Sequence, residues 1–256
     1  MSHPPIGMQA NVFGSKYRNP GEHAEAILDG VASAGFTAVE GGPPADPVLR
    51  NQMLRERGLR YAGGHTVRAA LDDDAKVDAM IRDLHACEAT DLCNSGLWNW
   101  LPQDLENFKF SIDLLNRTGR RFRREGIHLH YHDFEFRAVK GTETDPQIGM
   151  RILLDRLDPT ACDLCVDVAW VYRGNLCPAA YLKTIASHVG YLHLKDADEK
   201  NWFELGLGKV PFDKIFMLLP KLPNVRWLIY EQDTTEIDPV ESAKVSRAFL
   251  REKLGY

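Results

Sequence analysis

The chain has 256 residues, of which 44% are hydrophobic and 26% charged, and its formal net charge is -5. This length and composition are typical of one globular domain with a substantial core, which we expect to span residues 1–256. The acidic balance argues against a nucleic-acid partner, because binding to a phosphate backbone needs a basic face. The N-terminal residues lack the basic and apolar segments of a signal peptide, and no apolar run is long enough to span a bilayer. We therefore expect a cytoplasmic protein without a membrane partner.

Strand-like and helix-like segments alternate along the chain. The expected strands are residues 8–14, 36–41, 59–65, 92–96, 127–132, 162–167, 189–194 and 226–230. The helical segments that follow them are residues 20–34, 46–57, 72–87, 104–125, 146–157, 178–187, 212–219 and 239–254. Strict alternation predicts an α/β fold with a parallel sheet, and a count of eight favours closure into a (β/α)8 TIM barrel. A Rossmann fold is the weaker alternative, because the first turn contains no GxGxxG sequence.

The five cysteines are an odd number spread through the chain, which argues against a disulfide framework. Cys162 and Cys165 have CxxC spacing, but they lie inside an expected strand and no second pair follows. We interpret them as reduced core thiols rather than as a metal or redox site.

Ionisable residues stand at the ends of the last four expected strands. Glu135, Asp167, His193 and Glu231 follow one another at spacings of 26 to 38 residues. In a barrel these strand ends meet at the carboxyl mouth, where active sites lie. Each residue alone is more often a rim residue or a salt-bridge partner. Together, three carboxylates and a histidine would repel without a cation, and this oxygen and nitrogen set suits Mn²⁺, Mg²⁺, Co²⁺ or Zn²⁺.

Five segments in the second half of the chain carry sequence motifs. They are residues 129–136 (LHYHDFEF), 165–170 (CVDVAW), 191–196 (YLHLKD), 206–212 (GLGKVPF) and 230–233 (YEQD). These segments resemble the sugar phosphate isomerase/epimerase branch of the xylose isomerase-like TIM-barrel superfamily. The resemblance is dense over residues 127–233 and architectural before them. It implies one divalent metal ion, with Mn²⁺ preferred, held by Glu135, Asp167, His193 and Glu231. His132 is the competing ligand on the fifth strand.

The resemblance also implies an isomerase or epimerase of a keto sugar or related polyol that acts through a metal-stabilised enediolate. The alternative is a lyase or dehydratase that performs β-elimination on a 3-keto glycoside or inosose with the same site. DNA repair of the endonuclease IV type is disfavoured by the acidic net charge. A barrel without catalysis, serving as a binding subunit, is the fourth interpretation. Relatives often form oligomers, so a homo-oligomer or a partner subunit is expected.

Three residues are the candidate catalytic groups. His132 and Glu231 are candidate bases for removing the proton beside the carbonyl. Lys195 shares a strand face with His193 and is a candidate to bind or polarise a substrate oxygen. The competing interpretation of Lys195 is a salt bridge to Asp196 or to a neighbouring helix.

The substrate-binding candidates come from the remaining strand ends and the loops. They are Asn11, Glu40, His65, His130 and Trp170, and for several of them hydrogen bonding within the barrel is the competing interpretation. An apolar Trp170, where several sugar epimerases of the superfamily carry a polar contact, suggests a substrate other than a free ketohexose. The aromatic residues that either wall the pocket or pack in the core are Phe13, Trp98, Trp100, Phe134 and Trp170.

Overall fold

The structure is a computed structural model that describes residues 4–96, 105–132 and 148–255. Glu135 and the aromatic candidates Trp98, Trp100 and Phe134 lie outside the described residues. Within the described ranges, nine strands form one sheet in the order β3-β2-β1-β11-β8-β7-β6-β5-β4. They are β1 (Ile6–Gln9), β2 (Ala38–Glu40), β3 (Arg60–Gly63), β4 (His65–Thr66), β5 (Asp91–Ser95), β6 (His128–His132), β7 (Cys162–Asp167), β8 (Val189–Leu194) and β11 (Trp227–Tyr230).

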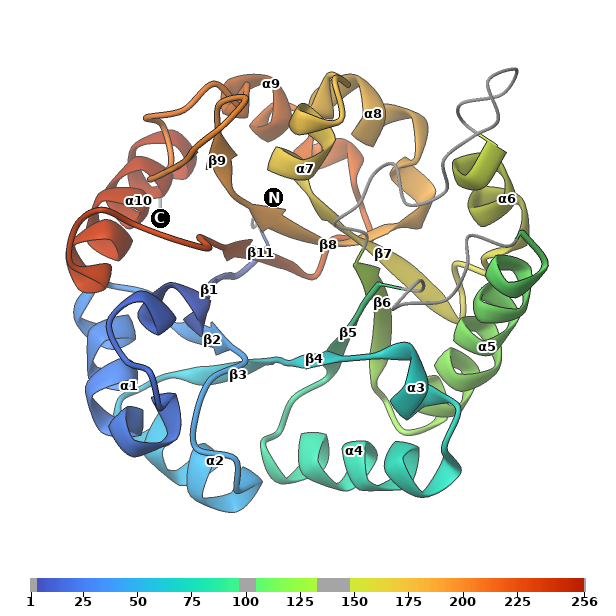
Figure 1. The fold of residues 1–256 in the computed structure, drawn as a ribbon, viewed down its shortest axis with the longest axis horizontal. Helices are drawn as coiled ribbons and strands as arrows, with labels where there is room; N and C mark the ends of the chain where they lie inside the picture. The colour runs from blue at the N-terminus through green and yellow to red at the C-terminus, as the bar shows by residue number, and fades with distance from the viewer. Residues whose placement is uncertain (1–3, 97–104, 133–147, 256) are drawn as a thin grey trace.

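All neighbouring strands of this sheet run parallel. The two edges of the sheet are β3 and β4, which follow each other in the chain and are two parts of the third expected strand. The sheet therefore curves into a nearly closed barrel (Figure 1). Gly63 at this join has a φ of +123°, and a Cβ atom on it would lie 2.2 Å from the carbonyl oxygen of Asp91. Only glycine allows so close an approach to β5. The predicted TIM barrel is confirmed.

Helices surround the strands in Figure 1. They are α1 (Ala24–Ser33), α2 (Pro47–Glu56), α3 (Arg68–Leu71), α4 (Asp74–Ala86), α5 (Leu105–Arg124), α6 (Ile148–Arg156), α7 (Val168–Arg173), α8 (Pro178–Thr184), α9 (Phe212–Phe216) and α10 (Pro239–Leu254). Short 3-10 helices are η1 (Ala10–Ser15), η2 (Pro20–His23), η3 (Ala186–His188) and η4 (Leu219–Lys221). Aspartates cap several helix starts, as Asp46 does for α2 and Asp238 for α10. In the part of the chain that the structure describes, no helix is both long enough and apolar enough to cross a membrane.

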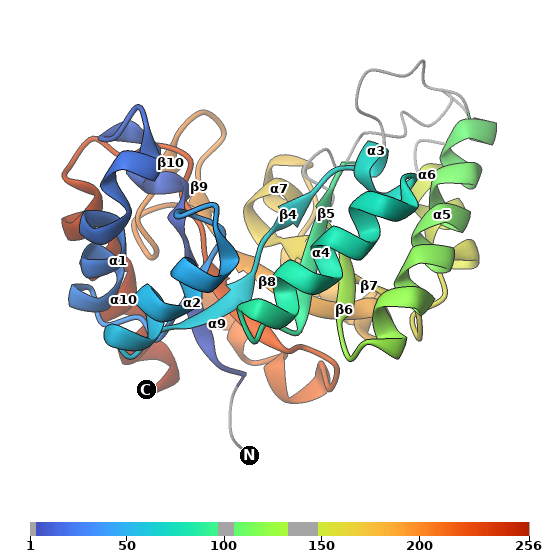
Figure 2. The same cartoon turned by 90° about the horizontal axis from the view of Figure 1, so that it is seen from below.

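Two local predictions differ from the structure. The first strand, expected over residues 8–14, is Ile6–Gln9, and the chain then turns into η1. The seventh strand is followed by a short antiparallel pair, β9 (Asp196–Ala197) and β10 (Trp202–Phe203), which the sequence does not predict. In Figure 2, α3, α7 and β10 lie toward the same end of the barrel, because each follows the carboxyl end of a strand.

The middle of the barrel is apolar. It is filled by a small group of side chains that includes Ala62, Cys93, Cys165, Tyr191 and Ile229, while a larger core lies between strands and helices. All five cysteines are free, and four of them are buried. Cys162 and Cys165 are both buried and free, which agrees with the interpretation of the CxxC pair as core thiols. This apolar layer separates polar groups at the carboxyl end of the strands from those at the amino end.

Candidate metal centre

Four buried side chains meet at the carboxyl mouth of the barrel. His132 ends β6, Asp167 ends β7, His193 lies on β8, and Glu231 directly follows β11. Each offers one donor atom, and these atoms lie within 4.8 Å of one another. Strand register explains part of the convergence, since Asp167 and His193 are paired neighbours on adjacent strands. The structure thus brings together three of the four predicted ligands and the competing ligand His132.

The inner atoms of this cluster are buried and have few partners. Oδ2 of Asp167 has no hydrogen-bond partner among the described residues. Nδ1 of His193 and Oε2 of Glu231 form an ion pair with each other at 2.5 Å. Buried polar atoms are nearly always satisfied, and an unsatisfied one is one sign of a missing ion. Two carboxylates and two imidazoles also form a donor set that suits a divalent cation, so the residues present fit a metal ion.

The charge states of three of the four side chains suit ligation at neutral pH. Burial raises the pKa of Asp167 to about 6, although the charge of Lys195 lowers it. For Glu231, burial is outweighed by the charges of His193 and Lys195, which lower the pKa of the carboxyl below its ordinary value. Burial lowers the pKa of His132 well below its ordinary value. Metal ligands must be ionised carboxylates or neutral imidazoles, and these three groups meet that requirement. For His193, burial is outweighed by the charges of Glu40 and Glu231, which raise the pKa of the ring well above its ordinary value. His193 must therefore release a proton when it binds a metal ion.

Lys195 adds a buried ammonium beside the cluster. Its Nζ lies 2.6 Å from Asp233 Oδ2, 3.2 Å from Glu231 Oε1 and 3.9 Å from Asp167 Oδ2. Burial opposes its charge, but these carboxylates raise the pKa of Lys195 above its ordinary value. Lys195 therefore points into the site and pairs with residues other than Asp196.

Asp196 has a different task. Its carboxylate accepts the backbone N–H groups of Gly206, Gly208 and Val210 at 2.9 to 3.1 Å. A Cβ atom on Gly208 would lie 2.3 Å from Asp196 Oδ1, so the loop needs glycine there. Asp196 thus fixes the glycine-containing loop that follows β10.

Two tryptophans form a wall next to Lys195. The rings of Trp170 and Trp202 meet edge to face at 5.1 Å, and Lys195 Nζ lies 4.3 Å from the Trp202 ring centre. The guanidinium of Arg173 lies 3.4 Å from the centre of the same Trp202 ring. Trp170 thus lies beside Lys195, whose Nζ is 5.6 Å from the centre of its ring, and its role in substrate binding stays a prediction. Phe13, in contrast, is 1% exposed and packs in the core.

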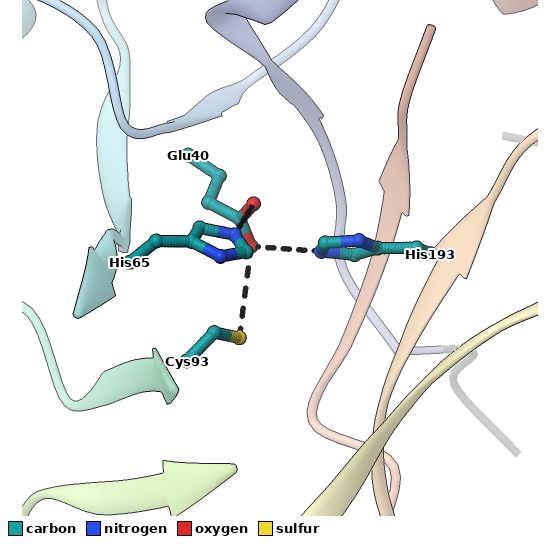
Figure 3. A group of neighbouring side chains, drawn as sticks. All are labelled: Glu40, His65, Cys93 and His193. Atoms are coloured by element: carbon teal, nitrogen blue, oxygen red, sulfur yellow. Dashed lines mark hydrogen bonds and ion pairs between the residues drawn. The ribbon is translucent and has the colours of Figure 1, made fainter. Parts of the chain in front are cut away.

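A second cluster of polar side chains, centred on Glu40, lies across the barrel mouth and shares His193 with the first cluster. Glu40 ends β2 and is completely buried, and its carboxylate accepts hydrogen bonds from Gln9 at 2.8 Å and His65 at 2.7 Å. Figure 3 shows His65, Cys93 and His193 pointing toward Glu40. Gln9 is not among the predicted site residues, because its place opposite Glu40 follows from the pairing of β1 with β2. Asn11, the candidate from that strand, lies on η1 and is exposed.

His130 lies deeper in the barrel. Strand parity correctly places it on the same side as His132, but two residues along a strand are about 6.6 Å apart. Its Nε2 contacts Asp91 Oδ1 at 2.9 Å, and Arg226 Nε also donates to that oxygen at 2.6 Å. His130 thus belongs to a buried polar network toward the amino end of the strands.

A parallel barrel with a buried carboxylate and histidine cluster at its carboxyl mouth is the architecture of a TIM-barrel enzyme. The model of the xylose isomerase-like TIM barrel family matches residues 28–253, and the chain belongs to that family. The resemblance noted in the sequence is therefore confirmed.

Proteins of known name that are similar to this chain include members of two reaction classes. Inosose dehydratase 2 of Bacillus cereus is 25% identical, with 90% of each chain covered, and inosose dehydratase of Clostridium beijerinckii is 27% identical, with 98% of this chain and 87% of the relative covered. A sugar phosphate isomerase/epimerase structure from Parabacteroides distasonis has a TM-score of 0.80 at 18% identity, covering 98% of this chain and 94% of that one. D-allulose 3-epimerase from Methylomonas sp. has a TM-score of 0.74 at 19% identity, covering 99% and 98%. The protein is an enzyme, and these relatives include both dehydratases and epimerases.

Proposed function

We propose that this enzyme binds one divalent metal ion and enolises a polyhydroxy ketone. The observation that carries the proposal is the convergence of His132, Asp167, His193 and Glu231, whose donor atoms lie within 4.8 Å of one another. Mn²⁺ is the expected ion, and Mg²⁺, Co²⁺ or Zn²⁺ would suit the same donors. When bound, the ion supplies positive charge that stabilises the ketone oxygen as its neighbouring carbon loses a proton.

The protein groups around the ion have separate tasks. The lowered pKa of His132 keeps it neutral at pH 7, so it can act as a ligand or accept a proton. If His132 is a ligand, Glu231 is the base; if Glu135 takes the fifth-strand position, His132 is free for that role. The ammonium of Lys195 is held by carboxylates and stays charged, so its task is to bind and polarise a substrate oxygen.

The substrate class follows from the relatives and the pocket wall. We favour β-elimination, with loss of water from an inosose or of the aglycone from a 3-keto glycoside, because the curated inosose dehydratases match most of this chain's length. Trp170 and Trp202 offer an apolar surface for the face of such a ring. Epimerisation or isomerisation of a keto sugar is the second candidate, favoured by the epimerase among the structural neighbours. Both reactions begin with the same proton removal.

The test separates proton removal from the later outcome. The enzyme loaded with Mn²⁺ is incubated in D₂O with inososes, 3-keto glycosides and keto sugars, and deuterium uptake and products are followed by NMR and mass spectrometry. We expect uptake at the carbon beside the ketone, and loss of water from an inosose or of the aglycone from a 3-keto glycoside. Epimer formation without either loss would favour the second candidate. Absence of metal-dependent deuterium uptake from every ketone would contradict the proposal.

A further inference from the structure

We infer that Glu40 is a positioning residue of the metal centre: it accepts the Nε2–H of His193 and thereby directs the Nδ1 lone pair of His193 toward the cation. The inference rests on the metal centre of the proposed function and assigns a role to a residue outside its ligand set. It concerns the end of β2, across the barrel mouth from β8.

The ring of His193 lies between two carboxylates. Its Nε2 is 3.1 Å from Glu40 Oε2, and its Nδ1 is 2.5 Å from Glu231 Oε2. The ring has no exposed surface. A histidine that binds a metal through one nitrogen carries a proton on the other, and that N–H needs an acceptor. Because Nδ1 faces Glu231, it is the metal-facing nitrogen, and Nε2 keeps the proton.

Glu40 is itself firmly held. Its Oε1 accepts hydrogen bonds from Gln9 and His65. Its Oε2 faces His193, as Figure 3 shows. β2 and β8 are not neighbours in the sheet, since β1 and β11 lie between them. The Glu40 contact therefore crosses the barrel mouth, and it fixes the orientation of His193 from a direction that the backbone of β8 does not control.

Glu40, His65, Cys93 and His193 also have donor atoms within 4.8 Å of one another, which raises the question of a second metal site. The contacts favour a hydrogen-bond cluster instead. The two oxygens of Glu40 already face three nitrogen atoms, which belong to Gln9, His65 and His193. The Cys93 sulfur lies 4.0 Å from Glu40 Oε2. Burial raises the pKa of the Cys93 thiol, and a neutral thiol is a poor ligand.

A cobalt titration tests the inference. Wild type, Glu40→Gln and Cys93→Ser are freed of metal and titrated with Co²⁺, with visible absorption giving stoichiometry and chelator competition giving Kd. We expect one Co²⁺ per chain in all three, a Kd for Glu40→Gln about 10 to 100 times weaker, and a nearly unchanged Kd for Cys93→Ser. Circular dichroism confirms that each variant is folded.

A second measurement needs no variant. In the wild-type protein with ¹⁵N-labelled histidine and bound Zn²⁺, the ring of His193 should show metal on Nδ1 and a retained proton on Nε2. Metal on Nε2, or an unchanged Kd in Glu40→Gln, would overturn the inference. Two Co²⁺ ions per chain, with a sulfur-to-cobalt absorption band lost in Cys93→Ser, would overturn it in favour of a second site. Failure of wild type to bind Co²⁺ at all would instead contradict the proposed function, and the inference with it.

Discussion

Replacement of Lys195 by methionine should have opposite effects on metal affinity and on catalysis. The ammonium balances the charges of Glu231 and Asp167, which are also candidate ligands. In the metal-free protein its loss leaves two buried carboxylates without their cation. With metal bound, the ion supplies that balance. Lys195→Met should therefore bind metal more tightly than wild type, while turnover falls because a substrate contact is lost.

The magnitude follows from the distances. At an effective dielectric constant of about 20, unit charges attract by about 5 kcal/mol at the 3.2 Å that separates Lys195 from Glu231, and by about 4 kcal/mol at the 3.9 Å to Asp167. Desolvation offsets much of this, and breaking a buried ion pair costs about 3 to 5 kcal/mol. The carboxylate of Asp233 is 37% exposed, so its pair adds less than about 1 kcal/mol.

We expect Lys195→Met to lower the free energy of unfolding by about 3 kcal/mol without metal and by about 1 kcal/mol with saturating Mn²⁺. The difference of about 2 kcal/mol corresponds to roughly 30-fold tighter metal binding. Urea unfolding in EDTA and in Mn²⁺ measures the first pair of values, and chelator competition measures the affinity. Lys209→Met is the control, because its ion pair with Glu199 is exposed and should contribute little to stability with or without metal. Equal destabilisation with and without metal, or weaker metal binding, would refute this reasoning.

Three further predictions concern the ligands, the pocket wall and pH. Asp167→Ala should lose bound metal in elemental analysis and turnover together; retention of both would remove Asp167 from the ligand set. Trp202→Ala should raise KM about tenfold with a smaller change in kcat, since a ring contact is lost; an unchanged KM would show that the ring does not touch substrate. Burial, with Arg226 and Arg123, lowers the pKa of His128 to about 4, so the unfolded chain binds an extra proton between about pH 6.5 and 4. The free energy of unfolding should fall as the pH is lowered through this window, less steeply in His128→Asn than in wild type or in the control His85→Asn; equal slopes would contradict the assignment.

The strands that carry the site were predictable because their patterns are local. β7 and β8 begin and end at the expected residues, since each is an apolar run that stops at a polar group. The end of β1 was misplaced because Ala10–Ser15 contains residues that also favour strands, yet they turn into η1. Sequence periodicity does not show whether such a segment continues as a strand or turns into a 3-10 helix, because tertiary packing decides between the two.

The residues of the candidate site likewise include some that the sequence predicts and some that it does not. Asp167, His193 and Glu231 stand at strand ends and could be found from spacing alone. Trp202 could not, because β10 exists through the β9 pairing and the loop that Asp196 fixes. Gln9 was missed because its place opposite Glu40 follows from the register of β1 and β2. Residues placed by long-range contacts leave no periodic signal in the sequence.

The most direct test of the metal centre is anomalous diffraction from crystals of the wild-type protein grown with Mn²⁺. We predict one anomalous peak bounded by His132, Asp167, His193 and Glu231, within about 2.0 to 2.3 Å of the ligating atoms. A peak elsewhere in the barrel, or these side chains contacting only protein groups at saturating Mn²⁺, would contradict the account.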